Sequence, residues 1–397
     1  MAGSRLSPRA EPEPGAFSVV SATSGRLGID GREALFVLSV FSLSRLLVFG
    51  AMVLSPLVVP PVQRSSTWNL DDPILRPLLR WDAGWYLTIA KHGYSYDGHP
   101  GRQQNIAFFP LYPVTCRLCH VITGASVPLC GALLSNGAFL VALATLYVLV
   151  TGEVGSRTAR LTLVLLAFFP GSLFFSTMYT ESFYLLFSAQ AFLAFQKERF
   201  ILGGCWAGLA SATRLPGILL LVPLLARALP RLKDRPVRGR LALAAMLASS
   251  GLAGFMIYQA IAFGDPLAYL RVQQAWGRSM GPLFGGVVDD LASNSHPSQF
   301  KLLDIDAGLT LLFIALTYVV FRQLPWSYGA YTLLNTIALA TGGTHSMARY
   351  LSVLFPGFVA LAVIAHKWKW IPWLIIPVFA LALAVFSIRF AQWYSVG

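Results

Sequence analysis

One carboxylate, Asp82, lies among aromatic residues in a polar stretch that separates two long apolar runs. Because its surroundings withdraw it partly from water, this carboxylate is expected to be a stronger base than a solvated one. If the stretch is helical, Trp85 and Tyr86 follow at three and four residues and share its face. We therefore take Asp82 as the candidate catalytic base, with a structural ion pair to Arg80 or Arg76 as the alternative.

A second carboxylate and two arginines also lie beside apolar segments. Glu181 stands in a short polar turn, where it either caps the next helix or faces a cavity and binds a substrate hydroxyl or amine. Arg214 and Arg349 adjoin apolar segments, where a cation is costly and tends to face a cavity or an anion. A guanidinium suits bidentate contact with phosphate, and snorkelling to the interface is the alternative for each. His345, four residues before Arg349, either joins that site or serves as a structural hydrogen-bonding group.

The elements that must position these groups are membrane helices. Of the 397 residues, 56% are hydrophobic and only 12% are charged, about half the charge of a soluble domain. Apolar runs near the roughly 20 residues that cross a bilayer recur along the chain. The composition therefore predicts an all-α polytopic membrane protein of about eleven transmembrane or half-membrane helices.

The net charge of +13 falls mostly in short segments between the spans. This pattern is typical of topology set by the positive-inside bias, so we expect no nucleic-acid partner. Residues 1–32 are expected to be a disordered cytoplasmic N-terminus and residues 33–397 one transmembrane domain. The four cysteines are too few for a disulfide framework and lack zinc spacing, so no metal site is predicted.

The predicted spans leave two long loops on the extracytoplasmic side, residues 60–126 and 264–306. The first loop is expected to contain interfacial helices over residues 73–92 and 109–122, because it is polar yet rich in aromatic side chains. The expected spans are residues 33–59, 127–150, 161–177, 183–196, a pair within 201–228 broken at 214–217, 241–263, 307–321, 326–340, 351–365 and 371–390. The broken pair keeps the basic cluster at residues 227–240 in the cytoplasm. The acidic and histidine-containing clusters then all lie outside.

Several motifs together resemble the PIG-V-type mannosyltransferases, relatives of the second mannosyltransferase of GPI-anchor assembly that include bacterial members. The first loop carries the most specific of them, WDAGWYLTIA over residues 81–90, then GY at 93–94 and AFFPLYP at 107–113. Weaker ones follow in order: YTESF at 179–183, ATRLPG at 212–217, GDPL at 264–267 and ARYL at 348–351. The similarity covers most of the chain after about residue 33. Thr180 departs from the pattern, where proline or another small residue is expected.

The resemblance implies a GT-C-type glycosyltransferase that takes mannose from a polyprenyl-phosphate donor on the extracytoplasmic side of the membrane. The role of base then falls on Asp82, which would accept the proton of the attacking hydroxyl. The lipid phosphate leaves already ionised, so it needs cations rather than a general acid. A single base without a paired acid indicates one displacement with inversion. Candidate substrate contacts are Arg80, Trp81, Trp85, Tyr86, Phe109, Tyr112, Glu181, Arg214, His345, Arg349 and Tyr350.

The acceptor is expected to be a lipid-linked or cell-envelope glycan, with no cofactor and no metal required. The chain's compact size and its arginine- and alanine-rich bias favour a multi-pass protein of the bacterial plasma membrane. A lipid-glycan flippase or transporter is one alternative, which would show charged residues inside the spans and paired hydropathy repeats. A non-catalytic subunit of a transferase complex is the other.

Overall fold

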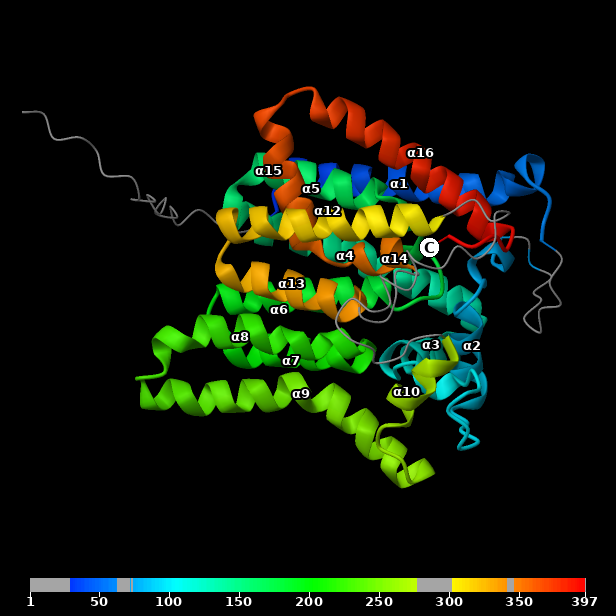
Figure 1. Ribbon diagram of the computed structural model, residues 1–397, viewed down its shortest axis with the longest axis horizontal. Coiled ribbons are helices and arrows are strands. Elements are labelled where there is room, and N and C mark those ends of the chain that lie inside the picture. Colours follow the sequence, from blue (N-terminus) through cyan, green and yellow to red (C-terminus); the bar gives the residue numbers. More distant parts are fainter. Residues whose placement is uncertain (1–28, 63–71, 73, 277–301, 341–345, 397) are drawn as a thin grey trace, which may run out of the picture.

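The computed structural model describes residues 29–62, 72, 74–276, 302–340 and 346–396, and all regular secondary structure within these ranges is helical. Long helices lie roughly side by side in one bundle, and shorter helices gather at one end of it (Figure 1). The long helices and their immediate partners are α1 (Gly31–Val58), α4 (Val127–Val154), α5 (Ser156–Phe168), α6 (Glu181–Gln196), α7 (Phe200–Thr213), α8 (Leu221–Ala228), α9 (Arg235–Phe263), α12 (Leu302–Gln323), α13 (Trp326–Ala340), α15 (Phe355–Lys367) and α16 (Ile371–Ala391). The prediction of an all-helical fold is confirmed.

Five of these helices, α1, α4, α9, α12 and α16, are long and apolar enough to cross a membrane. Their outer faces leave large apolar side chains uncovered: Ile261 and Trp373 are each 82% exposed and Leu57 is 84% exposed. Such surfaces are stable in lipid and unfavourable in water. The chain is therefore an integral multi-pass membrane protein, and the number of eleven crossings stays a prediction.

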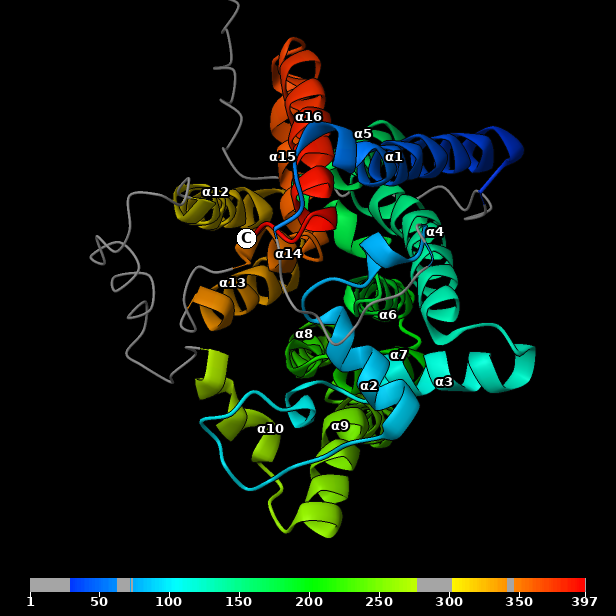
Figure 2. The ribbon, with the colours of Figure 1, turned by 90° about the vertical axis from the view of Figure 1, so that its right-hand side faces the viewer.

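The first loop forms two short helices, of which the first begins at Ala83 rather than at the predicted residue 73. They are α2 (Ala83–His92) and α3 (Leu111–Thr123), joined by the 3-10 turn Asn105–Ala107. In α3, Val121 and Ile122 are 70% and 73% exposed although they are apolar, as expected of a helix lying in the membrane surface. Figure 2 views the bundle from this end, with α2, α3 and α10 (Ala268–Arg271) nearest the reader.

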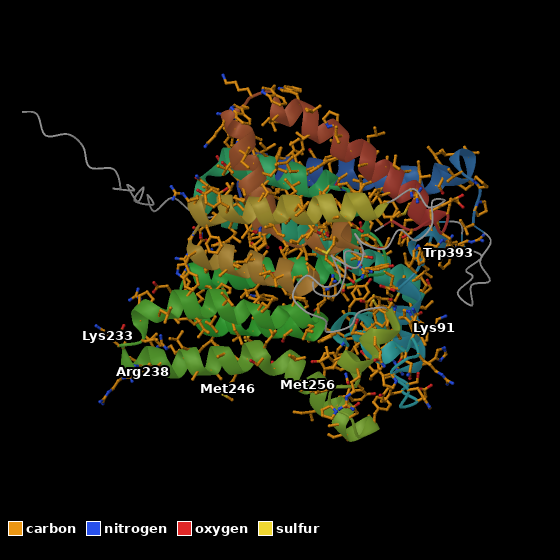
Figure 3. The ribbon with its side chains drawn as sticks, in the orientation of Figure 1. Lys91, Lys233, Arg238, Met246, Met256 and Trp393 are labelled. Atoms are coloured by element: carbon orange, nitrogen blue, oxygen red, sulfur yellow. The ribbon has the colours of Figure 1, made fainter. Side chains whose placement is uncertain are left out.

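The predicted break at residues 214–217 is confirmed. α7 ends at Thr213, Arg214 is extended, and Leu215–Leu220 forms a 3-10 helix (η4) that leads back into α8. The turn needs Gly217, because a Cβ there would lie 2.3 Å from the Ser211 backbone nitrogen. The return brings the basic cluster to the end of the bundle opposite α2. Figure 3 shows Lys233 and Arg238 at that end and Lys91 at the other.

The expected single span over residues 161–177 is wrong. α5 ends at Phe168, and Pro170–Phe175 forms a 3-10 helix (η3), because proline lacks the N–H group that a continuing α-helix needs. The freed carbonyls are taken by Arg45 of α1, which donates to the oxygens of Ala167 at 3.2 Å and Ser172 at 2.8 Å. The role of this buried arginine inside the predicted span 33–59 was missed; its cost inside a membrane is offset by these hydrogen bonds.

The turn expected around residues 344–350 is partly helical. α14 runs over Met347–Leu351, and α15 starts at Phe355 rather than at the predicted residue 351. This short helix carries Arg349 to the same end of the bundle as α2 (Figure 1). His345 lies outside the described residues.

Candidate active site

Asp82 is the N-cap residue of α2, so its side chain projects from the start of that helix. The preceding residue, Trp81, has a left-handed backbone with φ of 55°, which turns the chain sharply. The hydroxyl of Tyr179 fixes this turn from both sides: it donates to the carbonyl of Arg80 and accepts from the N–H of Asp82, each at 3.1 Å. The position of the carboxylate is therefore set by a buried tyrosine on another segment.

Arg349 is positioned by an acid that the sequence analysis missed. Asp306, at the start of α12 and 3% exposed, accepts hydrogen bonds from the N–H groups of Ser346 at 3.1 Å and Ala348 at 2.8 Å. It therefore caps the helix that carries Arg349. On the other side, Gly171 of η3 leaves room for the Ala348 carbonyl, because a Cβ at residue 171 would lie 2.0 Å from that oxygen.

The four predicted charges form one continuous chain of ion pairs. Arg349 Nη1 donates to Asp82 Oδ2 at 2.8 Å, and Arg349 Nε lies 3.4 Å from Glu181 Oε1. Arg214 Nη1 donates to the same Glu181 oxygen at 2.6 Å. Two carboxylates and two guanidiniums alternate, so the formal charges of the chain sum to zero. The alternative in which Asp82 pairs with Arg80 or Arg76 is wrong: its partner is Arg349.

One oxygen of this group of four charged residues has capacity left for a ligand. Within the described residues, Glu181 Oε2 is buried and makes no hydrogen bond, whereas Arg349 Nε faces Glu181 Oε1. Buried polar atoms are satisfied in more than 90% of cases, so Glu181 Oε2 marks a place where a polar ligand fits. Burial and the nearby Glu181 carboxylate raise the pKa of the Tyr86 phenol, which therefore stays protonated.

The charged chain lies in a cavity of about 710 Å³ that also has apolar and aromatic walls. The predicted site residues that line it are Asp82, Tyr86, Phe109, Glu181, Arg214, Arg349 and Tyr350. Apolar residues of η4 and α13 form a second wall: Leu215, Pro216, Ile218, Leu219, Ala338 and Leu339. A third part comes from the second loop: Tyr269, Leu270, Arg271, Gln273, Gln274 and Trp276. The sequence analysis missed this last group, because loop residues without periodicity give no signal of where they lie.

Four other predicted contacts do not line the cavity. Arg80 donates to the Ala391 carbonyl at 2.9 Å and lies over the Trp393 ring. Trp81 packs against the same ring, with centroids 5.9 Å apart. The other two contact residues that line the cavity: Trp85 stacks on Phe108, and the Tyr112 ring packs edge-on against Tyr86. The Tyr112 hydroxyl donates to the Gly131 carbonyl at 3.0 Å.

The arrangement combines a carboxylate, two cations and an apolar wall in one cavity. Asp82 uses Oδ2 for Arg349, and within the described residues no hydrogen bond is made by Oδ1, which leaves a lone pair for a substrate proton. Arg214 and Arg349 offer guanidinium groups to an anion. Among the described residues, no group of three or more His, Cys, Asp or Glu side chains is placed to hold a metal ion.

Comparison with known proteins matches more than half of the chain to one family. A family model described as mannosyltransferase (PIG-V) matches residues 32–275. GPI mannosyltransferase 2 of Cryptococcus neoformans var. neoformans serotype D is 32% identical over 172 residues, which are 40% of this chain and 38% of that protein. GPI alpha-1,6-mannosyltransferase 2 of Mus musculus is 28% identical over 171 residues, which are 39% of this chain and 32% of that protein. The match thus spans less than two fifths of the length of either relative.

Solved structures share the fold. ArnT from Cupriavidus metallidurans in the apo state aligns with a TM-score of 0.52 at 12% identity, over 91% of this chain and 77% of that one. The Archaeoglobus fulgidus oligosaccharyltransferase in the apo form also gives 0.52, at 15% identity, over 91% of this chain and 56% of that one. The fold is therefore GT-C-like, as the sequence predicts, and at these identities the likeness concerns the fold alone.

Proposed function

Because the chain belongs to the PIG-V mannosyltransferase family, we propose that it transfers mannose from a polyprenyl-phosphate-mannose donor to a lipid-linked or cell-envelope acceptor. The single observation that carries this proposal is the chain of alternating charges in a cavity with an apolar wall. A donor of this class has a phosphate, a sugar and a long apolar tail. The cavity offers a matching group for each of these three parts.

In this scheme the donor phosphate lies against Arg214 and Arg349, and the start of its tail lies along η4 and α13. Arg214 lines the cavity next to Leu215 and Pro216 of η4, so the charged and apolar walls meet there. The unsatisfied Glu181 Oε2 accepts a hydrogen bond from a sugar hydroxyl. These contacts orient the anomeric carbon toward Asp82.

Asp82 acts as general base on the acceptor. Its Oδ1 takes the proton of the acceptor hydroxyl as that oxygen forms a bond to the anomeric carbon. The bond from that carbon to the phosphate oxygen breaks, and its electron pair leaves with the phosphate, which Arg214 and Arg349 stabilise. One displacement of this kind inverts the anomeric configuration.

The ion pair between Arg349 and Asp82 gives this scheme an order of events. Arg349 Nη1 donates to Asp82 Oδ2 at 2.8 Å, so this guanidinium is engaged by the carboxylate before a donor binds. An incoming phosphate competes with Asp82 for the same guanidinium. Donor binding therefore loosens the pair and frees Asp82 Oδ2 when a sugar is present to transfer.

We place the cavity on the extracytoplasmic side, in the bacterial plasma membrane. The support is the distribution of basic residues: Lys233 and Arg238 lie at the end opposite to Lys91 of α2 (Figure 3), and basic segments favour the cytoplasm. Labelling of single cysteines introduced at Lys91 and Lys233 in intact cells tests this orientation. We expect a membrane-impermeant reagent to modify the variant at residue 91 and to spare that at residue 233.

The test of the proposed function is a transfer assay with the purified chain in lipid nanodiscs. Polyprenyl-phosphate mannose and polyprenyl-phosphate glucose are offered with candidate acceptors, and the linkage of the product is determined. We expect transfer from the mannose donor, with a product anomer opposite to that of the donor. A flippase or a non-catalytic subunit gives no transfer from the purified chain, and retention of configuration contradicts the single displacement.

A further inference from the structure

The part of the cavity formed by the second loop has no role in the donor contacts described above. This part consists of α10 (Ala268–Arg271) and the 3-10 helix η6 (Val272–Trp276). It is firmly held: the Phe109 ring packs against Phe255 and Tyr269 with centroids 5.1 and 5.5 Å apart. The Tyr269 N–H also donates to Gln259 Oε1 at 2.9 Å. The segment is therefore a fixed wall of the cavity, beside the first-loop turn Asn105–Ala107 (Figure 2).

A row of aromatic rings joins this wall to the base. Tyr86 lies on α2, four residues after Asp82, and meets Phe108 with centroids 5.1 Å apart. Phe108 in turn meets Trp276 at 5.7 Å, in an edge-to-face arrangement. All four residues line the same cavity. The row thus leads from α2, the helix that begins after Asp82, to the second-loop wall, and the Tyr86 hydroxyl at its start also lies within reach of the Glu181 and Arg214 charges.

The chemistry of this wall suits a neutral ring that carries hydroxyl groups. Gln273 and Gln274 line it. An amide can both donate to and accept from a hydroxyl, and one N–H of Gln273 already donates to the Tyr269 carbonyl at 3.3 Å. The face of Trp276 offers an apolar surface with a polar N–H at its edge. Arg271 also lines the wall but is paired with Asp265 at 2.9 Å, so its charge is already balanced.

The two ends of the cavity therefore differ in the ligand that they fit. An in-line displacement needs the acceptor on the side of the base and the leaving phosphate on the side of the cations. Arg214 and the apolar wall mark the phosphate side. The aromatic row marks the side from which an acceptor hydroxyl reaches Asp82.

We propose that Phe108, Gln273, Gln274 and Trp276 form an acceptor subsite that binds a sugar or polyol ring and presents its hydroxyl to Asp82. This inference rests on the proposed function for the direction of transfer, but the binding of a ring to these residues is independent of it. The subsite makes the second loop the determinant of acceptor specificity. A simple long-chain alcohol would lack the contacts that it offers.

Binding is tested first, without any transfer. Saturation-transfer NMR follows methyl α-mannobioside added to the full chain in nanodiscs. We expect signal from the wild type and from Trp276→Phe, which keeps an aromatic face, and loss of signal from Trp276→Ala and Gln274→Leu. Trp373→Ala and Gln323→Leu are matched controls, because both residues are exposed and lie outside the cavity. Equal signal from all variants overturns the subsite.

Transfer is tested second, with polyprenyl-phosphate mannose as donor and octyl mannoside or octanol as acceptor. We expect Trp276→Ala to raise the KM for octyl mannoside about tenfold, the effect of losing one aromatic contact, and to leave the KM for the donor unchanged. Equal use of octanol and octyl mannoside by the wild type, or an equal rise in both KM values, overturns the subsite while transfer itself stands. If methyl α-mannobioside binds in a way that depends on Trp276 but the wild type transfers no mannose, the proposed function is wrong and the subsite is still supported.

Discussion

The sharpest structural prediction concerns Glu181, the carboxylate that holds both arginines. Its side chain is 1% exposed, and those of Arg349 and Arg214 are 10% and 14% exposed. The substitution Glu181→Gln keeps the shape but removes one negative charge. The balanced chain of two carboxylates and two guanidiniums then carries one uncompensated positive charge in a poorly hydrated place.

The expected cost follows from the burial of the pair. Removing one partner of a buried ion pair costs about 3–5 kcal/mol. The lower end applies here, because the Asp82 side chain at the end of the chain is 25% exposed and lets water approach. We therefore expect Glu181→Gln to lose about 3 kcal/mol of stability. The double variant Glu181→Gln/Arg214→Gln restores neutrality and should recover part of that stability without recovering transfer.

The assay is thermal unfolding of the purified variants in one detergent, at one scan rate. Glu198→Gln is the matched control, because Glu198 pairs with Arg231 at 2.8 Å but the two side chains are 54% and 48% exposed. A surface pair of this kind contributes about 0–1 kcal/mol. Equal losses of stability for Glu181→Gln and Glu198→Gln would contradict a special cost for the buried charges. A double variant no more stable than Glu181→Gln would contradict it as well.

Two further predictions concern the support of Arg349. Asp306→Asn replaces one of the two capping oxygens with an NH₂ group, which faces the Ser346 N–H. We expect the KM for the sugar donor to rise in the transfer assay, and to rise further for Asp306→Ala. Equal KM values for the wild type and both variants contradict the positioning role of Asp306. Gly171→Ala places a methyl group against the Ala348 carbonyl. We expect this variant to have lower transfer activity and a lower unfolding temperature than Gly137→Ala, whose methyl group meets nothing within 4 Å. Similar activity and unfolding temperature for the two variants contradict the close packing at Gly171.

Much of the fold could be predicted because a helix that crosses a bilayer needs a long continuous run of apolar residues. Continuous apolar runs predicted α1, α4, α9, α12 and α16, which a bilayer favours over any other use of such segments. The charge rule predicted the break near Arg214, because an unbroken span would have carried a basic cluster across the membrane. The error at Pro170 had a local cause: proline ended the helix, and the apolar run continued in another conformation.

The site was predicted as a set of residues but not as a network. Asp82, Glu181 and Arg349 were expected on one side and Arg214 at a break between two half-spans, and the structure brings all four into one cavity. Their pairing depends on contacts between residues as far apart as 82 and 349, and one sequence holds no signal for that. Arg80 shows the limit of local reasoning, because the left-handed turn at Trp81 directs it away from the cavity.

The buried support residues were missed for a different reason. Asp306 and Arg45 stand within apolar helices, where a single charge is outweighed by its neighbours in any hydropathy average. Their partners are backbone groups freed by helix ends elsewhere in the chain. Charges inside predicted spans deserve a search for such ends, since few other groups can satisfy them there.

The central claim, that Asp82 is the base for mannosyl transfer, is tested most directly by Asp82→Asn. Transfer from polyprenyl-phosphate mannose is measured with the wild type, with Asp82→Asn and with Asp97→Asn, an exposed acid of the same loop. We expect Asp82→Asn to lose about 10²–10⁴-fold in rate, the usual effect of removing a general base, while Asp97→Asn keeps the wild-type rate. A folded Asp82→Asn variant that transfers mannose at a near-normal rate contradicts the role of Asp82 as base.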